Sequence, residues 1–199
     1  MSRSRSKNSS QKVSQQGSIR IIAGLWRGRK LPVGQAEGLR PTTDRVKETL
    51  FNWLAQDVSQ ASCLDLFAGS GSLGFEAASR QAKSVVMLEL NKQTHLQLTK
   101  NIATINTSNI KAINTDALSF LSEPGTPFDI VFVDPPFRQG LLEQCLQRLE
   151  TNNWLAKNAM IYVETEKELM LPDIPNNWSL YREKSAGQVS YRLFERNSQ

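Results

Sequence analysis

Residues 63–76 read Cys63-Leu64-Asp65-Leu66-Phe67-Ala68-Gly69-Ser70-Gly71-Ser72-Leu73-Gly74-Phe75-Glu76, and this stretch decides the fold. The short apolar run at 62–67 is typical of a buried parallel strand. Gly69, Gly71 and Gly74 follow in a G-x-G-x-x-G spacing, in which glycine permits a left-handed turn and lets a helix pack closely. The same spacing occurs in nicotinamide and flavin enzymes and in ordinary tight turns. By itself it predicts a strand, a glycine turn and the opening of a helix.

Acidic residues stand at the ends of four successive strand-like runs. The carboxyl ends of parallel strands share one edge of a sheet, and open α/β sheets bind ligands at that edge. Glu89 follows Asp65 by 24 positions, close to the separation at which an acid hydrogen-bonds the ribose hydroxyls of a nucleotide-like ligand. Asp65 itself precedes the glycine turn, where a carboxylate can meet a cationic amine. The four acids are Asp65, Glu89, Asp116 and Asp134, and Asp116 is equally well explained as a helix N-cap.

With these acids in place, the chain resembles the class I S-adenosylmethionine-dependent methyltransferases. Its Asp134-Pro135-Pro136-Phe137 motif resembles the signature of the branch that methylates exocyclic amino groups. Such an amine is a poor nucleophile because its lone pair is delocalised into the ring, so the enzyme must align it and favour a pyramidal nitrogen. The Asp134 carboxylate and the Pro135 carbonyl can each accept one N–H, while two prolines stiffen the loop. Phe137 offers a face for a flipped-out base. Whether Asp134 also takes the final proton stays open.

The pattern of apolar runs predicts one doubly wound α/β domain. Strand-like runs alternate with helical stretches through 62–164, which gives five parallel strands. Alternating runs at 178–184 and 189–195 predict a β-hairpin. We therefore expect a Rossmann-like class I methyltransferase fold whose seven-stranded, mostly parallel sheet ends in an antiparallel C-terminal hairpin. Residues 61–199 would form this core, and residues 19–60 a short N-terminal extension of β-hairpin and helix.

Several element boundaries follow from local signals. The sequence predicts a strand at 19–24, a helix at about 140–152 and the fifth parallel strand at 159–164. The block Arg40-Pro41-Thr42-Thr43-Asp44 signals a helix start, because Thr and Asp are good N-caps and proline blocks extension backwards. Arg40 and Thr42, at the mouth of that helix, can reach a ligand's carboxylate or an RNA.

The basic charge is concentrated at the start of the chain. The first 36 residues hold eight of the 24 Lys and Arg and no Asp or Glu, which leaves 16 basic against 19 acidic residues elsewhere. This asymmetry predicts a polyanion met by one end of the molecule, although a solubilising tail has the same composition. Residues 1–18 are predicted to form a disordered basic arm. Trp26 can stack on a base or simply pack in its hairpin. The candidate RNA-binding residues are Arg20, Trp26, Arg27, Arg29, Lys30 and Arg138.

Other classes of protein are disfavoured by composition. No apolar run approaches the roughly 18 residues needed to cross a bilayer. Cys63 and Cys145 form no C-x-x-C pair, and no export signal is visible, which favours a reducing cytoplasm. His95 is the single histidine and there is no cysteine cluster, so no protein-bound metal site is expected. We expect a cytoplasmic protein, most simply a monomer, without a membrane partner.

The resemblance extends to a narrower family, the bacterial small-subunit ribosomal RNA guanine-N2 methyltransferases of the RsmD type. It spans Ile19 to Glu195, and the Gly187-Gln188-Val189-Ser190-Tyr191 segment adds to its specificity. Five blocks stand in the family's order: Arg20-Ile21-Ile22-Ala23-Gly24, Trp26-Arg27-Gly28-Arg29, Arg40-Pro41-Thr42-Thr43-Asp44-Arg45-Val46-Lys47-Glu48, Asp65-Leu66-Phe67-Ala68-Gly69-Ser70-Gly71 and Asp134-Pro135-Pro136-Phe137.

This family resemblance implies methyl transfer from S-adenosylmethionine to the N2 amine of guanine 966 in 16S RNA, within 30S assembly particles that carry ribosomal proteins. From this resemblance, together with the strand-end acids, the glycine spacing and the helix-start signal, we expect catalysis by the Asp-Pro-Pro-Phe motif and cofactor binding by the following residues: Asp65, Phe67, Gly69, Gly71, Gly74, Glu89, Asp116, Arg40 and Thr42. One alternative is an amino methyltransferase acting on adenine N6 in DNA or RNA, or on a protein glutamine. Another is a non-catalytic RNA-binding or nicotinamide-binding module, which leaves the proline pair unexplained.

Overall fold

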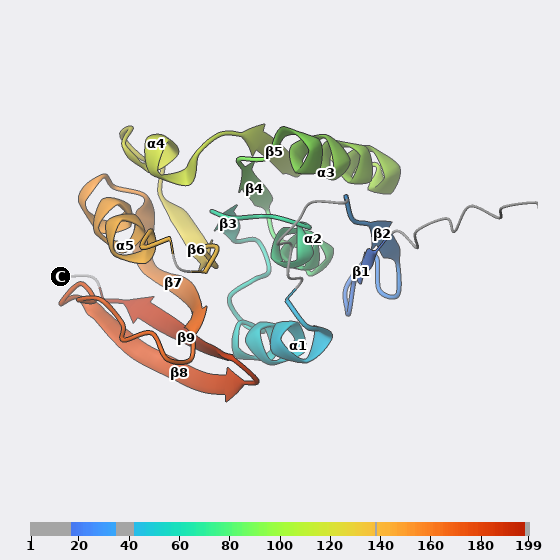
Figure 1. Ribbon diagram of the computed structural model, residues 1–199. Helices are drawn as coiled ribbons and strands as arrows, with labels where there is room; N and C mark the ends of the chain where they lie inside the picture. Colours follow the sequence, from blue (N-terminus) through green and yellow to red (C-terminus); the bar gives the residue numbers. More distant parts are fainter. Residues whose placement is uncertain (1–16, 35–41, 138, 198–199) are drawn as a thin grey trace, which may run out of the picture.

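A seven-stranded sheet forms the centre of the computed structural model, which describes residues 17–34, 42–137 and 139–197 (Figure 1). The strand order is β5-β4-β3-β6-β7-β9-β8, parallel from β5 to β7 and antiparallel in the two pairs that β9 makes. This confirms the expected mostly parallel sheet with an antiparallel C-terminal hairpin. The strands are β3 Ser62–Asp65, β4 Ser84–Glu89, β5 Ile110–Asn114, β6 Phe128–Val133, β7 Leu155–Glu166, β8 Trp178–Ala186 and β9 Val189–Arg196.

Helices cover both faces of this sheet (Figure 1). Side chains alternate between the faces of a strand, so in β6 Ile130 and Phe132 pack on one side and Val131 and Val133 on the other. The first side meets α1, α2 and α3, and the second meets α4 and α5. The helices are α1 Asp44–Trp53, α2 Ser72–Ser79, α3 Lys92–Ile105, α4 Ala117–Leu121 and α5 Leu142–Thr151. Double coverage explains why the central strands are apolar throughout.

The strand order reverses between β3 and β6. From β3 the chain runs outward through β4 and β5, and it then returns to place β6 on the other side of β3. Open α/β sheets bind ligands at this switch point, outside the carboxyl ends of the strands. The glycine turn after β3 therefore lies where the fold favours a binding site.

The N-terminal hairpin consists of β1 Ser18–Arg20 and β2 Lys30–Pro32, and it docks on α2 (Figure 1). The strand expected at 19–24 is wrong beyond Arg20. The Ile21 amide still bonds the Arg29 carbonyl at 2.9 Å, but the following amides bond a side chain instead of a neighbouring strand. The buried Glu76 carboxylate accepts hydrogen bonds from the amides of Ile22 (2.7 Å) and Ala23 (3.0 Å). Arg80 Nε lies 2.8 Å from the same carboxylate and balances its charge.

The boundaries of β7 and α5 also differ from expectation. Strand β7 begins at Leu155 instead of 159, because Leu155 already pairs with Phe128 before a register shift between Phe128 and Ile130. Helix α5 begins at Leu142 instead of 140, since Gly140 has a left-handed φ of 64° that a helix cannot include. Neither change moves a candidate site residue.

Some expectations fall outside the described residues, namely most of the basic arm, Arg40 and Arg138. Thr43 is the N-cap of α1, as its sequence signal predicts, and accepts a hydrogen bond from the Val46 amide. Within the three described ranges, no helix combines the length and apolar composition that a membrane span requires.

Candidate active site

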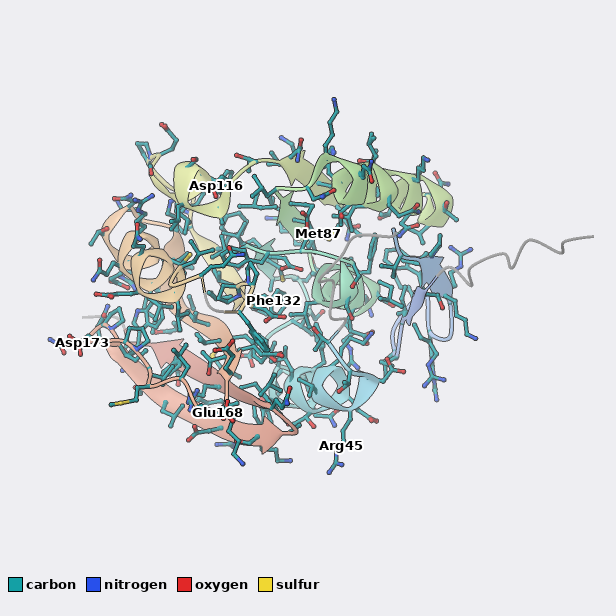
Figure 2. All side chains as sticks on the ribbon, viewed as in Figure 1. Arg45, Met87, Asp116, Phe132, Glu168 and Asp173 are labelled. Carbon is teal, nitrogen blue, oxygen red and sulfur yellow. The ribbon has the colours of Figure 1, made fainter. Side chains whose placement is uncertain are left out.

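The turn after β3 uses its glycines for two different purposes. Gly69 and Gly71 have left-handed φ angles of 51° and 79°, and the Gly71 amide donates to the Ala68 carbonyl at 2.7 Å. A Cβ at Gly74 would lie 2.5 Å from the sulfur of Met87, which lies in the interior of the molecule (Figure 2). Gly74 thus lets α2 approach β4, as the spacing predicts. Gly71 and Gly74 do not line the cavity described next.

A cavity of about 430 Å³ lies beside this turn, at the carboxyl edge of the sheet. Pockets of roughly 300–1,000 Å³ accommodate cofactor-sized ligands. Candidate residues that follow four different strands line this cavity, and they include residues predicted to bind the cofactor and residues predicted to act in catalysis. The predicted residues that line it are Thr42, Asp65, Phe67, Gly69, Glu89, Asp116, Asp134, Pro135, Pro136 and Phe137.

Asp65 is the most deeply buried acid of this cavity, with 2% of its surface exposed. Burial raises the pKa of Asp65 from 3.8 to about 7, helped by the negative charge of Glu89 and opposed by hydrogen bonds from the Gly74 and Phe67 amides. A cation that enters the cavity would stabilise the charged form of this carboxyl group and would thereby be bound favourably. Asp65 is therefore suited to bind an ammonium group.

Glu89 connects the end of β4 to the glycine turn. One carboxylate oxygen accepts from the Gly69 amide at 2.9 Å, and the other accepts from the Asn91 amide at 2.6 Å. These bonds fix the orientation of the carboxylate, while its remaining acceptor sites stay available to ribose hydroxyls. The predicted ribose contact is thus compatible with a second, structural role.

Asp116 performs the N-cap role that the sequence left as one of two explanations. Its carboxylate accepts from the Ser119 amide at 2.8 Å at the start of α4, where Figure 2 labels it. The residue also lines the cavity, so capping and ligand contact are not exclusive. Its second oxygen can accept from the amino group of an adenine.

The Asp134-Pro135-Pro136-Phe137 loop follows β6 and lines the same cavity. Phe137 is 37% exposed, so its ring is accessible to a base. Behind the loop, burial together with the negative charges of Glu164 and Asp134 raises the pKa of Tyr162 well above its ordinary value. The Tyr162 hydroxyl therefore stays protonated.

Glu164 is a cavity residue that the sequence reasoning missed. It is 6% exposed, lines the cavity and accepts a hydrogen bond from the Tyr162 hydroxyl at 2.7 Å. The signal that identified the other four acids applies here too, because Glu164 lies toward the carboxyl end of β7. The expected strand at 159–164 ended on it without assigning it a role.

Lys47 was also missed, since its place in an amphipathic helix gives no sign of burial. Its ammonium donates to the Arg20 carbonyl at 2.6 Å and to Ser72 Oγ at 3.2 Å, and burial lowers its pKa. It thereby joins the N-terminal hairpin to the first residue of α2. A side cavity of about 500 Å³ lies at this junction, and Thr42 and Ser72 line both it and the main cavity.

Four of the candidate RNA-binding residues form an exposed basic surface on the hairpin, namely Arg20, Arg27, Arg29 and Lys30. Arg27, Arg29 and Lys30 are exposed, whereas Arg20 also lies 3.5 Å from Asp44. Trp26 packs partly against the core, and its amide donates to Ser79 Oγ at 3.0 Å. The packed interpretation of Trp26 therefore has direct structural support, and base stacking stays a prediction.

Comparison with known proteins gives close relatives over nearly the whole chain. The chain is 59% identical to the ribosomal RNA small subunit methyltransferase D of Escherichia coli, covering 92% of each protein. It is 58% identical to the Haemophilus influenzae protein of the same name, covering 90% of this chain and 94% of that one.

A solved structure, the yhhF protein of Escherichia coli, provisionally described as a methyltransferase, superposes with a TM-score of 0.87 at 57% identity. The match covers 92% of this chain and all of that one.

The fold is that of the class I methyltransferases. The family model described as "Conserved hypothetical protein 95" matches residues 19–195. This range includes the glycine turn, the four strand-end acids and the Asp-Pro-Pro-Phe loop. The chain belongs to the family described as Conserved hypothetical protein 95.

Proposed function

We propose that this protein transfers a methyl group from S-adenosylmethionine to the N2 amine of one guanine, guanine 966, in 16S ribosomal RNA. The observation that supports this most directly is the shared cavity. Asp134 and the two prolines line the same cavity as Asp65, Glu89 and Asp116. A donor site and an acceptor site must adjoin for direct transfer. The name of the Escherichia coli relative supports the choice of small-subunit ribosomal RNA.

The donor set at the sheet edge fits S-adenosylmethionine. Asp65 would hold the ammonium group of its methionine part, Glu89 the ribose hydroxyls and Asp116 the adenine amino group. Phe67 and Gly69 line the cavity between these acids. Thr42, which lines it from the start of α1, and Arg40, which precedes it in the chain, are proposed to assist at the ligand's carboxylate. When bound, the cofactor supplies a methyl group that its sulfonium centre already activates.

The protein's own part in the reaction is positioning. Asp134 would accept one N–H of the guanine amine and the Pro135 carbonyl the other, which favours a pyramidal nitrogen. Phe137, exposed at the rim, would stack on the flipped base. Arg20, Trp26, Arg27, Arg29, Lys30 and Arg138 would bind the surrounding RNA. We propose that a monomer acts in the bacterial cytoplasm on 30S particles that already carry ribosomal proteins.

The test is a labelling experiment with the full chain. Incubating unmethylated 30S particles and naked 16S RNA with methyl-labelled cofactor should label one guanine N2, with the particles as the better substrate. Nuclease mapping of the product locates the label. Label on adenine N6 or on a protein glutamine would replace this function by the corresponding alternative, and binding of a nicotinamide nucleotide without methyl transfer would exclude it.

A further inference from the structure

We propose that Glu164 selects guanine, by accepting the N1–H of the target base while Asp134 holds its N2 amine. This inference rests on the proposed function and names the residue that distinguishes guanine from other bases carrying an amine. A second cavity of about 200 Å³ adjoins the main cavity. Glu164 and Thr42 line both this cavity and the main one, so Glu164 stands at the boundary between them.

The walls of the second cavity suit a flat base. Val46 of α1 and Val189 of β9 contribute apolar surface, and Thr42 and Thr43 contribute hydroxyl groups. Gly187 lies in the turn between β8 and β9, and a Cβ added there would have no other atom within 4 Å. The opening beside Gly187 therefore leaves space at the cavity rim. A base that passes the Asp134 loop would enter between these walls with its Watson–Crick edge toward Glu164.

Glu164 and Asp134 both line the main cavity. The Tyr162 hydroxyl donates to Glu164 Oε2 at 2.7 Å, and Asp134 is the other acid whose charge acts on Tyr162. Glu164 is 6% exposed and Tyr162 is fully buried, so the position of the Glu164 carboxylate is fixed by packing. A carboxylate has about four acceptor sites, so the bond from Tyr162 is compatible with a further donor.

Guanine presents two adjacent donors on its Watson–Crick edge, the N1–H and the N2 amine. Neighbouring carboxylates complement this pair, because an ionised carboxylate only accepts hydrogen bonds. Adenine carries an unprotonated N1 on the same edge, and its lone pair would face a carboxylate in a dry site. A polar site of this kind rejects an analogue that lacks the matching N–H. Glu164 therefore separates guanine from adenine, a choice that the Asp-Pro-Pro-Phe loop alone leaves open.

The experiment compares two RNAs that both carry the reacting amine. One has guanine at the target position and the other has 2-aminopurine, which keeps the 2-amino group but has an unprotonated N1. The wild-type full chain should methylate the guanine RNA with at least about tenfold higher kcat/KM. In Glu164→Gln the side-chain amide can donate to that N1. The preference should fall below about threefold or invert, chiefly through KM.

Three further measurements make the result specific. Glu166→Gln, the same substitution two residues along β7 in a residue that lines neither cavity, should keep the wild-type preference. Glu164→Asp retains the carboxylate, so it should keep the preference for guanine with a raised KM, and it serves if the glutamine variant does not fold. Calorimetry should show that both Glu164 variants bind the cofactor with nearly wild-type affinity.

The outcomes separate the two proposals. A Glu164→Gln enzyme that still prefers guanine as strongly as wild type overturns the role of Glu164 and leaves the proposed function intact. Wild-type protein that labels neither RNA, while binding the cofactor, overturns the proposed function and this inference with it.

Discussion

Asp65 is a buried carboxyl group that lines the cavity. Its protonation state therefore depends on what binds there. Its pKa is raised from 3.8 to about 7. A raised carboxyl pKa means that the folded protein binds more protons than the unfolded chain between those values. The contribution of Asp65 to the free energy of unfolding therefore falls as the pH rises from about 4 to about 7.

Replacing Asp65 by Asn should remove that pH dependence. In the cofactor-free protein, the free energy of unfolding of Asp65→Asn relative to wild type should increase between pH 4 and pH 8, as measured by urea unfolding at several pH values. S-adenosylmethionine affinity, measured by calorimetry at pH 8, should fall about tenfold or more, because the ammonium loses its counter-charge. A constant stability difference across this pH range would contradict the assignment.

Asp134 provides the corresponding test of catalysis. Asp134→Ala should lower kcat by a factor of about 100 or more, since it removes an acceptor for the reacting amine. Cofactor affinity should change less than about threefold, because other acids hold the cofactor.

Asp129→Asn is the control, in the strand β6 that leads to Asp134 but outside the cavity. Its carboxylate accepts from the Ser62 amide and hydroxyl at the other end of β6. Single-turnover kinetics with saturating cofactor separate the two variants. A nearly normal rate in Asp134→Ala would show that its carboxylate plays no part in the chemical step.

At the scale of elements, the glycine turn joins β3 to α2 through a position where both conformation and space demand glycine. Gly71 has φ 79°, and a Cβ there would lie 2.6 Å from Phe75 and 2.7 Å from Leu98. Gly28 in the N-terminal hairpin has a nearly identical φ of 82°, with nothing within 4 Å of a Cβ. Comparing substitutions at Gly28 and Gly71 therefore separates the free-energy cost of a left-handed backbone from the cost of overpacking.

Gly28→Ala should therefore cost about 1 kcal/mol in the free energy of unfolding, the penalty of a left-handed alanine. Gly71→Ala should cost roughly 1–3 kcal/mol more, because buried rings and methyl groups must move. Chemical denaturation of both variants gives the difference. Equal losses would mean that Phe75 and Leu98 adjust without strain.

For the whole molecule, the uneven charge distribution is retained in three dimensions as an exposed basic hairpin on one side of the domain (Figure 1). The Arg27→Ala/Arg29→Ala double variant should weaken binding of 16S RNA. The slope of log affinity against log salt should decrease in magnitude by about 1.5, which corresponds to two lost phosphate contacts.

Removing two exposed lysines elsewhere, Lys111 of β5 and Lys157 of β7, provides the charge-matched control. If the hairpin contacts the RNA, this double variant should keep most of the wild-type slope of log affinity against log salt concentration. Filter binding across a series of salt concentrations measures both. Identical slopes for the two double variants would mean that net charge, and not the hairpin, determines binding.

Local pattern was sufficient for most of the core. Short apolar runs determined the parallel strands, alternating runs determined the C-terminal hairpin and the glycine spacing determined the turn, because all three depend on neighbours within a few positions. The acids at strand ends identified the binding edge for the same reason, since parallel strands necessarily align their carboxyl ends.

Long-range contacts decided what the sequence could not. After β1 the Ile22 and Ala23 amides leave the hairpin pairing, because they bind Glu76, which lies more than 50 positions away in the sequence. Lys47 can be buried because its ammonium donates to the Arg20 carbonyl of the hairpin and to the Ser72 hydroxyl. Glu164 faces a cavity only because the start of α1 and the β8–β9 turn close around it. By itself the sequence determined the sheet, the glycine turn and the acidic edge, which depend on local periodicity. Only the tertiary structure decided which polar side chains are buried together, because partners distant in sequence must be brought into contact.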